Sequence, residues 1–155
     1  MAKKSDVLGK QGEELVIGAL RARGFLMPER IATPVKLIPH PKIRGYFRVI
    51  YGEKVSGDTR AVLPGGLSVL IETKTIFDRN LRWSDLSPHQ PGRLDRHAEE
   101  AVSLLAWVFD QGVQLMRWPI PGFAGSGDSI RPEEAVALNI WDVKELKELG
   151  GKGRK

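Results

Sequence analysis

GDTRAVLPGGLSVLIETKT, residues 57–75, is the stretch that decides the expected fold of this 155-residue chain. It contains two runs of strand-like composition, 58–63 and 68–75, and the second is the most strand-like run in the chain. Pro64-Gly65-Gly66 lies between the two runs, and proline followed by glycine is typical of a tight turn. The segment therefore predicts a β-hairpin.

The second strand of this hairpin carries an acid and a lysine two positions apart. Alternate side chains of a strand share a face, so Glu72 and Lys74 are expected to project together, away from Ile71 and Thr73. Pairing of the two strands can bring Asp58 beside Glu72. Two neighbouring carboxylates form a hard oxygen site that suits Mg²⁺ or Mn²⁺.

This combination suits the hydrolysis of phosphodiester bonds. A metal ion polarises the phosphoryl oxygen and lowers the pKa of a bound water molecule. Lys74 can orient that water or stabilise the charge that develops on the phosphorus centre. The alternative is that Lys74 only forms an outward-facing ion pair with Glu72, and that Asp58 is an ordinary turn residue. An acid on an otherwise apolar strand favours function, because carboxylates are rarely buried without a partner.

Before the hairpin, the chain predicts one helix and several extended segments. Gly24 is expected to end a helix over 5–23, whose inward side would be lined by Leu8, Leu15, Val16, Ala19 and Leu20. A short strand is expected to begin in 25–27. The prolines of 28–41 predict extended loop or edge structure, and the aromatic and β-branched run 46–51 predicts a strand.

After the hairpin, the chain predicts a helix and then a second hairpin. Ser87-Pro88 could start the helix, but Pro91-Gly92 follows at once, so we expect the helix to begin there and run to about residue 100. The runs 102–109 and 113–118 flank a turn-like sequence and predict a hairpin, with a helix continuing through Phe109 as the alternative. A glycine-rich loop at 122–128, short helices at 132–138 and 142–149, and a basic tail at 150–155 are expected to follow. This order predicts a single α/β domain over 1–155, with a core of about 5–120 and a mixed sheet carrying helices on its faces.

Composition indicates a polyanionic partner and excludes several kinds of site. The formal net charge is +5, and basic side chains gain by displacing counterions from phosphates. Between residues 28 and 49 the only acid is Glu29, which favours a phosphate-facing surface there. The absence of cysteine excludes disulfides, thiolate zinc sites and cysteine nucleophiles. The chain has neither a signal-peptide pattern nor an apolar run of roughly 18–20 residues, so we expect a cytoplasmic protein without a membrane partner.

Asp58 followed by Glu72-Thr73-Lys74 resembles the core signature of the PD-(D/E)XK nuclease superfamily. The resemblance implies a restriction-endonuclease-like fold, with a mixed sheet of about five strands flanked by helices, and a Mg²⁺-dependent endonuclease in which Mn²⁺ can substitute. It also implies that Asp58, Glu72 and the backbone carbonyl of Thr73 hold the metal. The superfamily places a glutamate on its first helix, and residues 9–16 resemble that element. Glu13 is preferred to Glu14 there, because it continues the inward side of the helix.

Leu86-Ser87-Pro88-His89-Gln90 resembles the histidine-glutamine element of RecU-type Holliday junction resolvases. The match covers approximately residues 9–120. It implies that Gln90 lies at the catalytic centre, that the substrate is branched DNA, and that the protein is a homodimer, because symmetric cleavage of a four-way junction needs two active sites related by a two-fold axis. The proline-rich stretch 28–41 and the region after Pro119 have no clear counterpart in that family.

Seven basic side chains are candidates for contacts with DNA: Lys42, Arg44, Arg48, Arg79, Arg82, His89 and Arg93. Tryptophans are more often packing residues than base-stacking platforms, and Trp83 is the exception worth testing, because it lies in the polar stretch 79–87 with Arg79 and Arg82 nearby. Two alternative functions remain at this point. One is a nicking or restriction-type nuclease that acts on linear duplex, and the other is a DNA-binding protein without catalytic activity.

Overall fold

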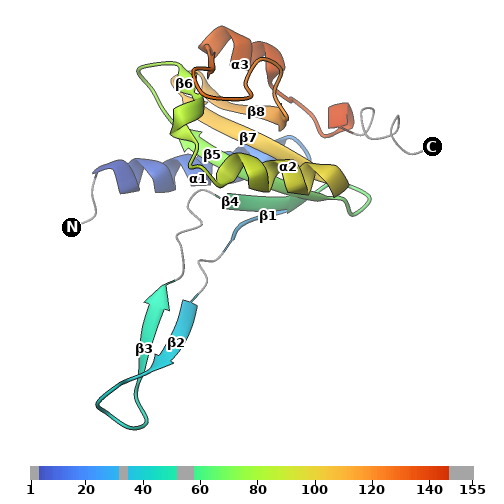
Figure 1. Cartoon of the computed structure of the whole chain (residues 1–155). Helices are drawn as coiled ribbons and strands as arrows, with labels where there is room; N and C mark the ends of the chain where they lie inside the picture. Colours follow the sequence, from blue (N-terminus) through green and yellow to red (C-terminus); the bar gives the residue numbers. More distant parts are fainter. Residues whose placement is uncertain (1–3, 32–34, 52–57, 147–155) are drawn as a thin grey trace.

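The computed structural model describes residues 4–31, 35–51 and 58–146, with side chains for these except 4–7, 35–37, 48–51 and 58. It is an α/β structure with a five-stranded mixed sheet in the order β1-β4-β5-β7-β8, which confirms the predicted fold class (Figure 1). Only β5 and β7 are parallel among these neighbours. The strands of this sheet are β1 (Leu26–Arg30), β4 (Asp58–Val62), β5 (Ser68–Thr75), β7 (Val102–Phe109) and β8 (Gly112–Trp118).

The hairpin predicted from residues 57–75 is formed by β4 and β5. Its turn is closed by hydrogen bonds from Leu63 N to Leu67 O at 2.8 Å and from Gly66 N to Leu63 O at 2.9 Å. Gly65 and Gly66 have φ values of +105° and +97°, which residues with a side chain rarely adopt. The turn sequence therefore fixes the register of the two strands.

Helix α1 (Lys4–Ala22) packs on one face of the sheet and α2 (Gln90–Glu100) packs on the other (Figure 1). Val16 and Leu20 of α1 share a buried cluster with Ile71 of β5, whereas Leu94 of α2 shares a second cluster with Leu70. Consecutive side chains of β5 thus point to opposite faces, as the period of a strand requires.

The predicted inward side of α1 is only partly right. Val16 and Leu20 are fully buried, but Leu8 and Leu15 are 36% and 56% exposed. The reason is Gly12, because a Cβ atom at this position would overlap the hydroxyl of Thr75 on β5. The helix therefore approaches the sheet along the stripe that contains residues 12, 16 and 20, and Leu15 lies to one side of that stripe.

The described part of the proline-rich stretch is extended, as expected: residues 28–30 belong to β1 at the edge of the five-stranded sheet, and residues 35–39 belong to a separate two-stranded ribbon. β2 (Val35–Pro39) pairs in antiparallel fashion with β3 (Phe47–Tyr51), and the ribbon projects away from the body of the molecule (Figure 1). At its tip, the ring nitrogen Nδ1 of His40 accepts hydrogen bonds from the backbone N–H groups of Lys42 and Ile43, both at 3.1 Å.

The second half of the chain follows the predicted order. The hairpin of β7 and β8 is present, and the alternative of a helix through Phe109 is wrong. A pair of two-residue strands, β6 (Leu81–Arg82) and β9 (Ser129–Ile130), was not anticipated, nor was the short 3-10 helix η1 (Trp83–Asp85). Helix α3 (Pro132–Leu138) has the bounds that the sequence predicted.

The last predicted helix is described only at its start. The carboxylate of Asp142 accepts a hydrogen bond from Lys144 N at 2.8 Å, as expected of a helix cap. Its continuation beyond residue 146 and the basic tail at 150–155 lie outside the described residues. Within the described part of the chain, none of the helices has the length and apolar character needed to cross a membrane.

Candidate active site

Glu72 and Lys74 project from β5 toward the face that α2 covers. The carboxylate of Glu72 is almost completely buried, with 2% of the residue exposed, and its Oε1 lies 3.6 Å from Lys74 Nζ. Their register partners on β7 are the buried residues Leu105 and Trp107. An ionised carboxylate in such apolar surroundings costs several kcal/mol unless charged and polar partners stabilise it.

Gln90 supplies one such partner. As the first residue of α2, it donates from Nε2 to Glu72 Oε1 at 2.8 Å. The amide oxygen of Gln90 accepts the backbone N–H of Ser87, also at 2.8 Å, which fixes the orientation of the amide. The structure therefore brings Gln90, Glu72 and Lys74 together, as the sequence predicted.

The backbone register places Asp58 directly opposite Glu72 across β4 and β5. Ile76 N donates to Val108 O on β7 at 3.1 Å, and peptide groups two residues apart in a strand point the same way. The peptide groups of Glu72 therefore point toward β7 and away from β4. The pair with Asp58 is consequently of the type without direct hydrogen bonds, in which opposed Cα atoms are about 4.5 Å apart and side chains approach most closely. The side chain of Asp58 lies outside the described residues, so the carboxylate pair stays a prediction.

The same alternation directs the carbonyl group of Thr73 toward β4. The pairing of β4 with β5 ends at Asp58 and Glu72, whereas β7 pairs with β5 as far as Thr75. The carbonyl oxygen of Thr73 is thus at the point where β4 begins, next to Asp58. Carboxylate and carbonyl oxygens are the ligands that Mg²⁺ and Mn²⁺ prefer, so this donor set fits a hard divalent cation.

Glu13 is paired with Arg30 of β1. The distance from Arg30 Nε to Glu13 Oε2 is 3.2 Å, and Arg30 Nη2 lies 3.5 Å from Glu14 Oε1. The Glu13 side chain is 19% exposed and that of Glu14 is 73% exposed, in line with the expectation that Glu13 faces inward. Sequence reasoning did not anticipate Arg30, whose backbone pairs with Thr59, the neighbour of Asp58.

Among the described side chains, no group of three or more histidines, aspartates and glutamates could hold a metal ion. A metal site at this edge of the sheet therefore depends on Asp58 in addition to Glu72. Of the described histidines, His40 accepts hydrogen bonds at the ribbon tip, His89 is an exposed residue at the start of α2, and His97 lies in the last turn of α2.

The predicted phosphate contacts fall into two groups. Lys42 and Arg44 are exposed at the tip of the β2–β3 ribbon. Arg48 is a residue of β3, and its side chain lies outside the described residues. Arg79, Arg82 and His89 lie in the segment 76–89, between β5 and α2. Arg93 is a half-buried residue of α2.

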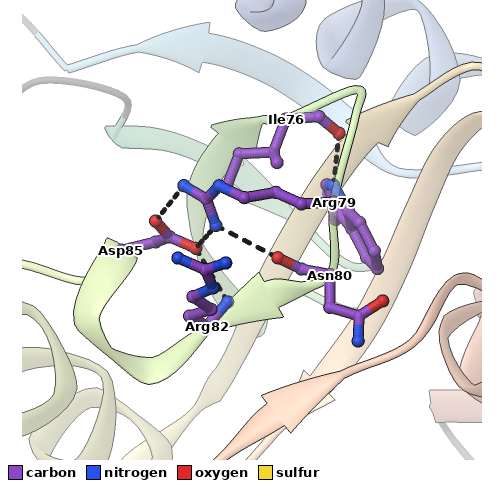
Figure 2. Close-up of polar contacts among 6 residues, drawn as sticks. Ile76, Arg79, Asn80, Arg82 and Asp85 are labelled. Atoms are coloured by element: carbon purple, nitrogen blue, oxygen red, sulfur yellow. Dashed lines mark hydrogen bonds and ion pairs between the residues drawn. The ribbon is translucent and has the colours of Figure 1, made fainter.

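Arg79 is a candidate whose charge is used within the protein. Its guanidinium donates two hydrogen bonds to the carboxylate of Asp85 (Figure 2). Their lengths are 2.6 and 2.8 Å. The same carboxylate accepts Arg82 N at 2.7 Å. The hydrogen bond from Arg79 holds the pKa of Asp85 below its ordinary value, although partial burial acts in the opposite direction. Arg79 and Asp85 therefore clamp the loop that joins β5 to α2.

The tryptophans are mainly packing residues, as expected. Trp107 and Trp118 are buried, and Trp107 Nε1 donates to Ile76 O at 2.9 Å. Trp141 is 63% exposed, and its ring lies 5.5 Å from the guanidinium carbon of Arg23. Trp83 is half-buried and lines a surface hollow that sequence reasoning did not locate.

Comparison with known proteins adds no family to these observations. No model of a known protein family matches the chain, and no curated protein sequence matches it.

Proposed function

We propose that this protein is a metal-dependent endonuclease that hydrolyses DNA phosphodiester bonds at the edge where β4 begins. The observation that carries the proposal is the buried carboxylate of Glu72, which is held by Gln90 and lies 3.6 Å from Lys74 Nζ, opposite Asp58 in register. A buried ion pair gives little net stability, and apolar residues of similar size often replace one without loss. A chemical role explains its presence better than a structural one.

Asp58, Glu72 and the carbonyl of Thr73 would hold Mg²⁺, with Mn²⁺ able to substitute. Bound there, the ion would polarise the phosphoryl oxygen and lower the pKa of the attacking water. The side chain of Lys74 is 17% exposed, so its ammonium can reach both Glu72 and a phosphate at the surface. It would orient the water and stabilise the charge that develops as one phosphorus–oxygen bond forms and the other breaks. Glu13 would act through water or a second ion.

The β2–β3 ribbon supports DNA as the substrate. A two-stranded β-ribbon fits the major groove of a duplex. Its tip exposes two cations, Lys42 and Arg44, beside the apolar side chains of Ile43, Tyr46 and Phe47, which are 48%, 66% and 60% exposed. Cations next to aromatic rings are typical of surfaces that bind nucleic acid.

Four-way junction DNA and a homodimer are the more specific parts of the proposal. They are supported by the resemblance of residues 86–90 to RecU-type resolvases and by the place of Gln90 against Glu72. Cleavage of linear duplex is the competing activity, and a panel of four-way junctions, flaps and plain duplexes with Mg²⁺ or Mn²⁺ would separate the two. Sedimentation of the protein with and without a junction would test the dimer.

The site is tested with Asp58→Asn, Glu72→Gln and Lys74→Ala, and with Glu99→Gln on the exposed part of α2 as a matched control. The three site variants should lose cleavage. The two acid variants should bind DNA as well as the parent or better, because a charge that repels phosphate is removed. Normal cutting by either acid variant would refute the site. Binding without cleavage by the parent protein, unchanged by Lys74→Ala, would instead support a non-catalytic DNA-binding protein.

The ribbon is tested with the double variant Lys42→Ala/Arg44→Ala. The plot of log affinity for DNA against log salt concentration should become less steep by about 2, because each phosphate contact contributes about 0.9 to the slope. Lys10→Ala/Arg21→Ala removes two exposed charges from α1 and should leave the slope unchanged. Equal slopes for the two double variants would exclude the ribbon tip from the DNA interface.

A further inference from the structure

We infer that a hollow between the segment 82–84 and the end of the glycine-rich loop holds an unpaired nucleobase of the bound DNA; the inference rests on the proposed function. The hollow has a volume of about 190 Å³ and is lined by Arg82, Trp83, Ser84, Gly127, Asp128 and Ser129. Its two walls are the start of η1 and the end of the glycine-rich loop, which the β6–β9 pairing holds together.

The indole of Trp83 forms a fixed aromatic wall. It stacks on Trp118, with ring centroids 5.9 Å apart and planes 25° apart, and it meets Phe123 edge-on at 5.2 Å. Trp118 is fixed in turn by a hydrogen bond from its Nε1 to Asp95 at 2.6 Å. Trp118 and Phe123 are 3% and 2% exposed, whereas Trp83 is only half-buried. A rigid aromatic ring that stays partly open suits base stacking, because little order must be gained on binding.

The opposite wall is also rigid and polar. Asp128 Oδ2 accepts the backbone N–H groups of Ala124 and Gly125 at 2.9 and 3.0 Å, and Asp128 O accepts Trp83 N at 2.9 Å. The carboxylate of Asp128 is thus occupied with its own loop. The hydroxyl groups of Ser84 and Ser129 remain on exposed residues, where they can form hydrogen bonds with the edge of a base.

Arg82 gives the hollow a cationic rim. Arg79 already balances the charge of Asp85 through two hydrogen bonds, and Arg82 contributes its backbone N–H to that carboxylate (Figure 2). The Arg82 residue is exposed, so its guanidinium can contact the phosphate that accompanies a bound base. An aromatic wall, two hydroxyls and an adjacent cation together match a nucleotide whose base has left the stack.

Hydrogen bonds link this hollow to the proposed catalytic carboxylate. Leu86 N donates to Trp83 O at 3.0 Å, Ser87 N donates to Gln90 Oε1, and Gln90 Nε2 donates to Glu72 Oε1, the last two both at 2.8 Å. The segment that carries the hollow is therefore the segment that orients Glu72. A base in the hollow would position the neighbouring backbone, and the protein would favour DNA with an unpaired base near the cut over a perfect duplex.

The test uses DNA that carries 2-aminopurine at one unpaired position, with EDTA present so that binding is observed without cleavage. Stacking on Trp83 should quench the probe. Ser129→Phe fills the hollow from an exposed strand position, and Arg82→Ala removes the cation. Each should weaken the preference for the unpaired base over a perfect duplex by about fivefold or more, and Ser129→Phe should abolish the quenching. Trp141→Phe, at an exposed tryptophan outside the hollow, should match the parent protein.

Trp83→Phe preserves an aromatic ring against Trp118 and Phe123, and near-ultraviolet circular dichroism reports whether that packing survives. Unchanged quenching and preference in both Ser129→Phe and Arg82→Ala would overturn the inference. The result is separable from the proposed activity. Cleavage by Glu72→Gln in Mg²⁺ would refute the proposed catalytic site, whereas the binding measured in EDTA refutes or supports the hollow alone.

Discussion

Replacing Gln90 with glutamate should make the stability of the protein depend strongly on pH. In the parent protein the amide of Gln90 donates to Glu72 Oε1 at 2.8 Å, and Glu72 is 2% exposed. Gln90→Glu retains the acceptor for Ser87 N but replaces the donor with a second carboxylate. Two carboxylates in hydrogen-bond contact inside a protein cannot both stay ionised without a large penalty.

The expected size follows from two costs. Losing a hydrogen bond to a charged group costs about 1.5–3 kcal/mol. The repulsion between the two carboxylates cannot cost more than binding one proton to the pair, because protonation removes the repulsion. For a carboxyl that titrates near 4.3 in the unfolded chain, binding that proton at pH 8 costs about 5 kcal/mol. Lys74, 3.6 Å from Glu72, offsets part of this repulsion. We therefore expect the variant to lose about 3–5 kcal/mol at pH 8.

The stability of Gln90→Glu relative to the parent should depend on the protons that the two carboxyl groups bind. Above about pH 4.3 the unfolded chain has released the protons of both carboxyl groups, whereas the folded variant keeps one proton between them. Its stability relative to the parent is therefore greatest in acid and falls as the pH rises, by up to about 1.4 kcal/mol per unit. Most of the deficit at pH 8 should have disappeared at pH 5.

Urea unfolding followed by tryptophan fluorescence at pH 5, 6, 7 and 8 measures this difference, with EDTA present because a metal ion could bridge the two acids. Gln111→Glu, on the exposed turn between β7 and β8, adds the same charge beside Asp110 at a solvent-exposed position. Water screens the repulsion there, so this variant should show no such trend. If Gln90→Glu follows Gln111→Glu at every pH, the contact between Gln90 and Glu72 does not exist in solution.

Two further variants test the packing of α1 and the loop clamp. Gly12→Ala should destabilise the protein by about 1–3 kcal/mol in urea unfolding, because the added methyl group would overlap Thr75. Gly18 has open space around it, so Gly18→Ala should stabilise the protein by about 0.5–1 kcal/mol. Equal effects of the two substitutions would contradict the close approach of α1 to β5. Asp85→Asn should cost about 1 kcal/mol at pH 7, a value reduced for solvent screening because Arg79 is 39% exposed. Since Arg79 lowers the pKa of Asp85 from 3.8, this stability is present above about pH 4 and is lost as the pH falls through the lowered pKa, so the difference between parent and variant should shrink as the pH is lowered. A difference that does not change with pH would show that the clamp is not electrostatic.

The β4–β5 hairpin could be predicted from sequence because all its determinants are local. The turn residues, the strand period and the length of the loop lie within 57–75, and together they fix the register that sets Asp58 opposite Glu72. The helix that carries Gln90 could be located from its prolines to within a residue. Local signals of this kind are sufficient when the partner of a segment is its neighbour in sequence.

The features that were missed depend on distant partners. Nothing within residues 81–82 indicates that they pair with 129–130, because two-residue strands have no period of their own. Leu15 was expected to face inward on spacing alone, whereas the choice among helix faces is made by Gly12 against Thr75. Arg79 counts as a free cation in the sequence, and only the folded loop shows that Asp85 uses its charge.

The site has the same division between local and distant causes. The spacing of Glu72 and Lys74 on one strand predicts that they share a face, and the structure places that face beneath α2, among Leu70, Leu105 and Trp107. Apolar side chains at these two positions would continue that cluster at no electrostatic cost. Instead, the amide of Gln90 donates to the carboxylate of Glu72, and the ammonium of Lys74 lies 3.6 Å from the same oxygen, at the point where β4 begins. The stability of the core alone gives no reason to place three polar groups at this position, next to the backbone of Thr73 and Asp58, and the proposed cation site would supply that reason.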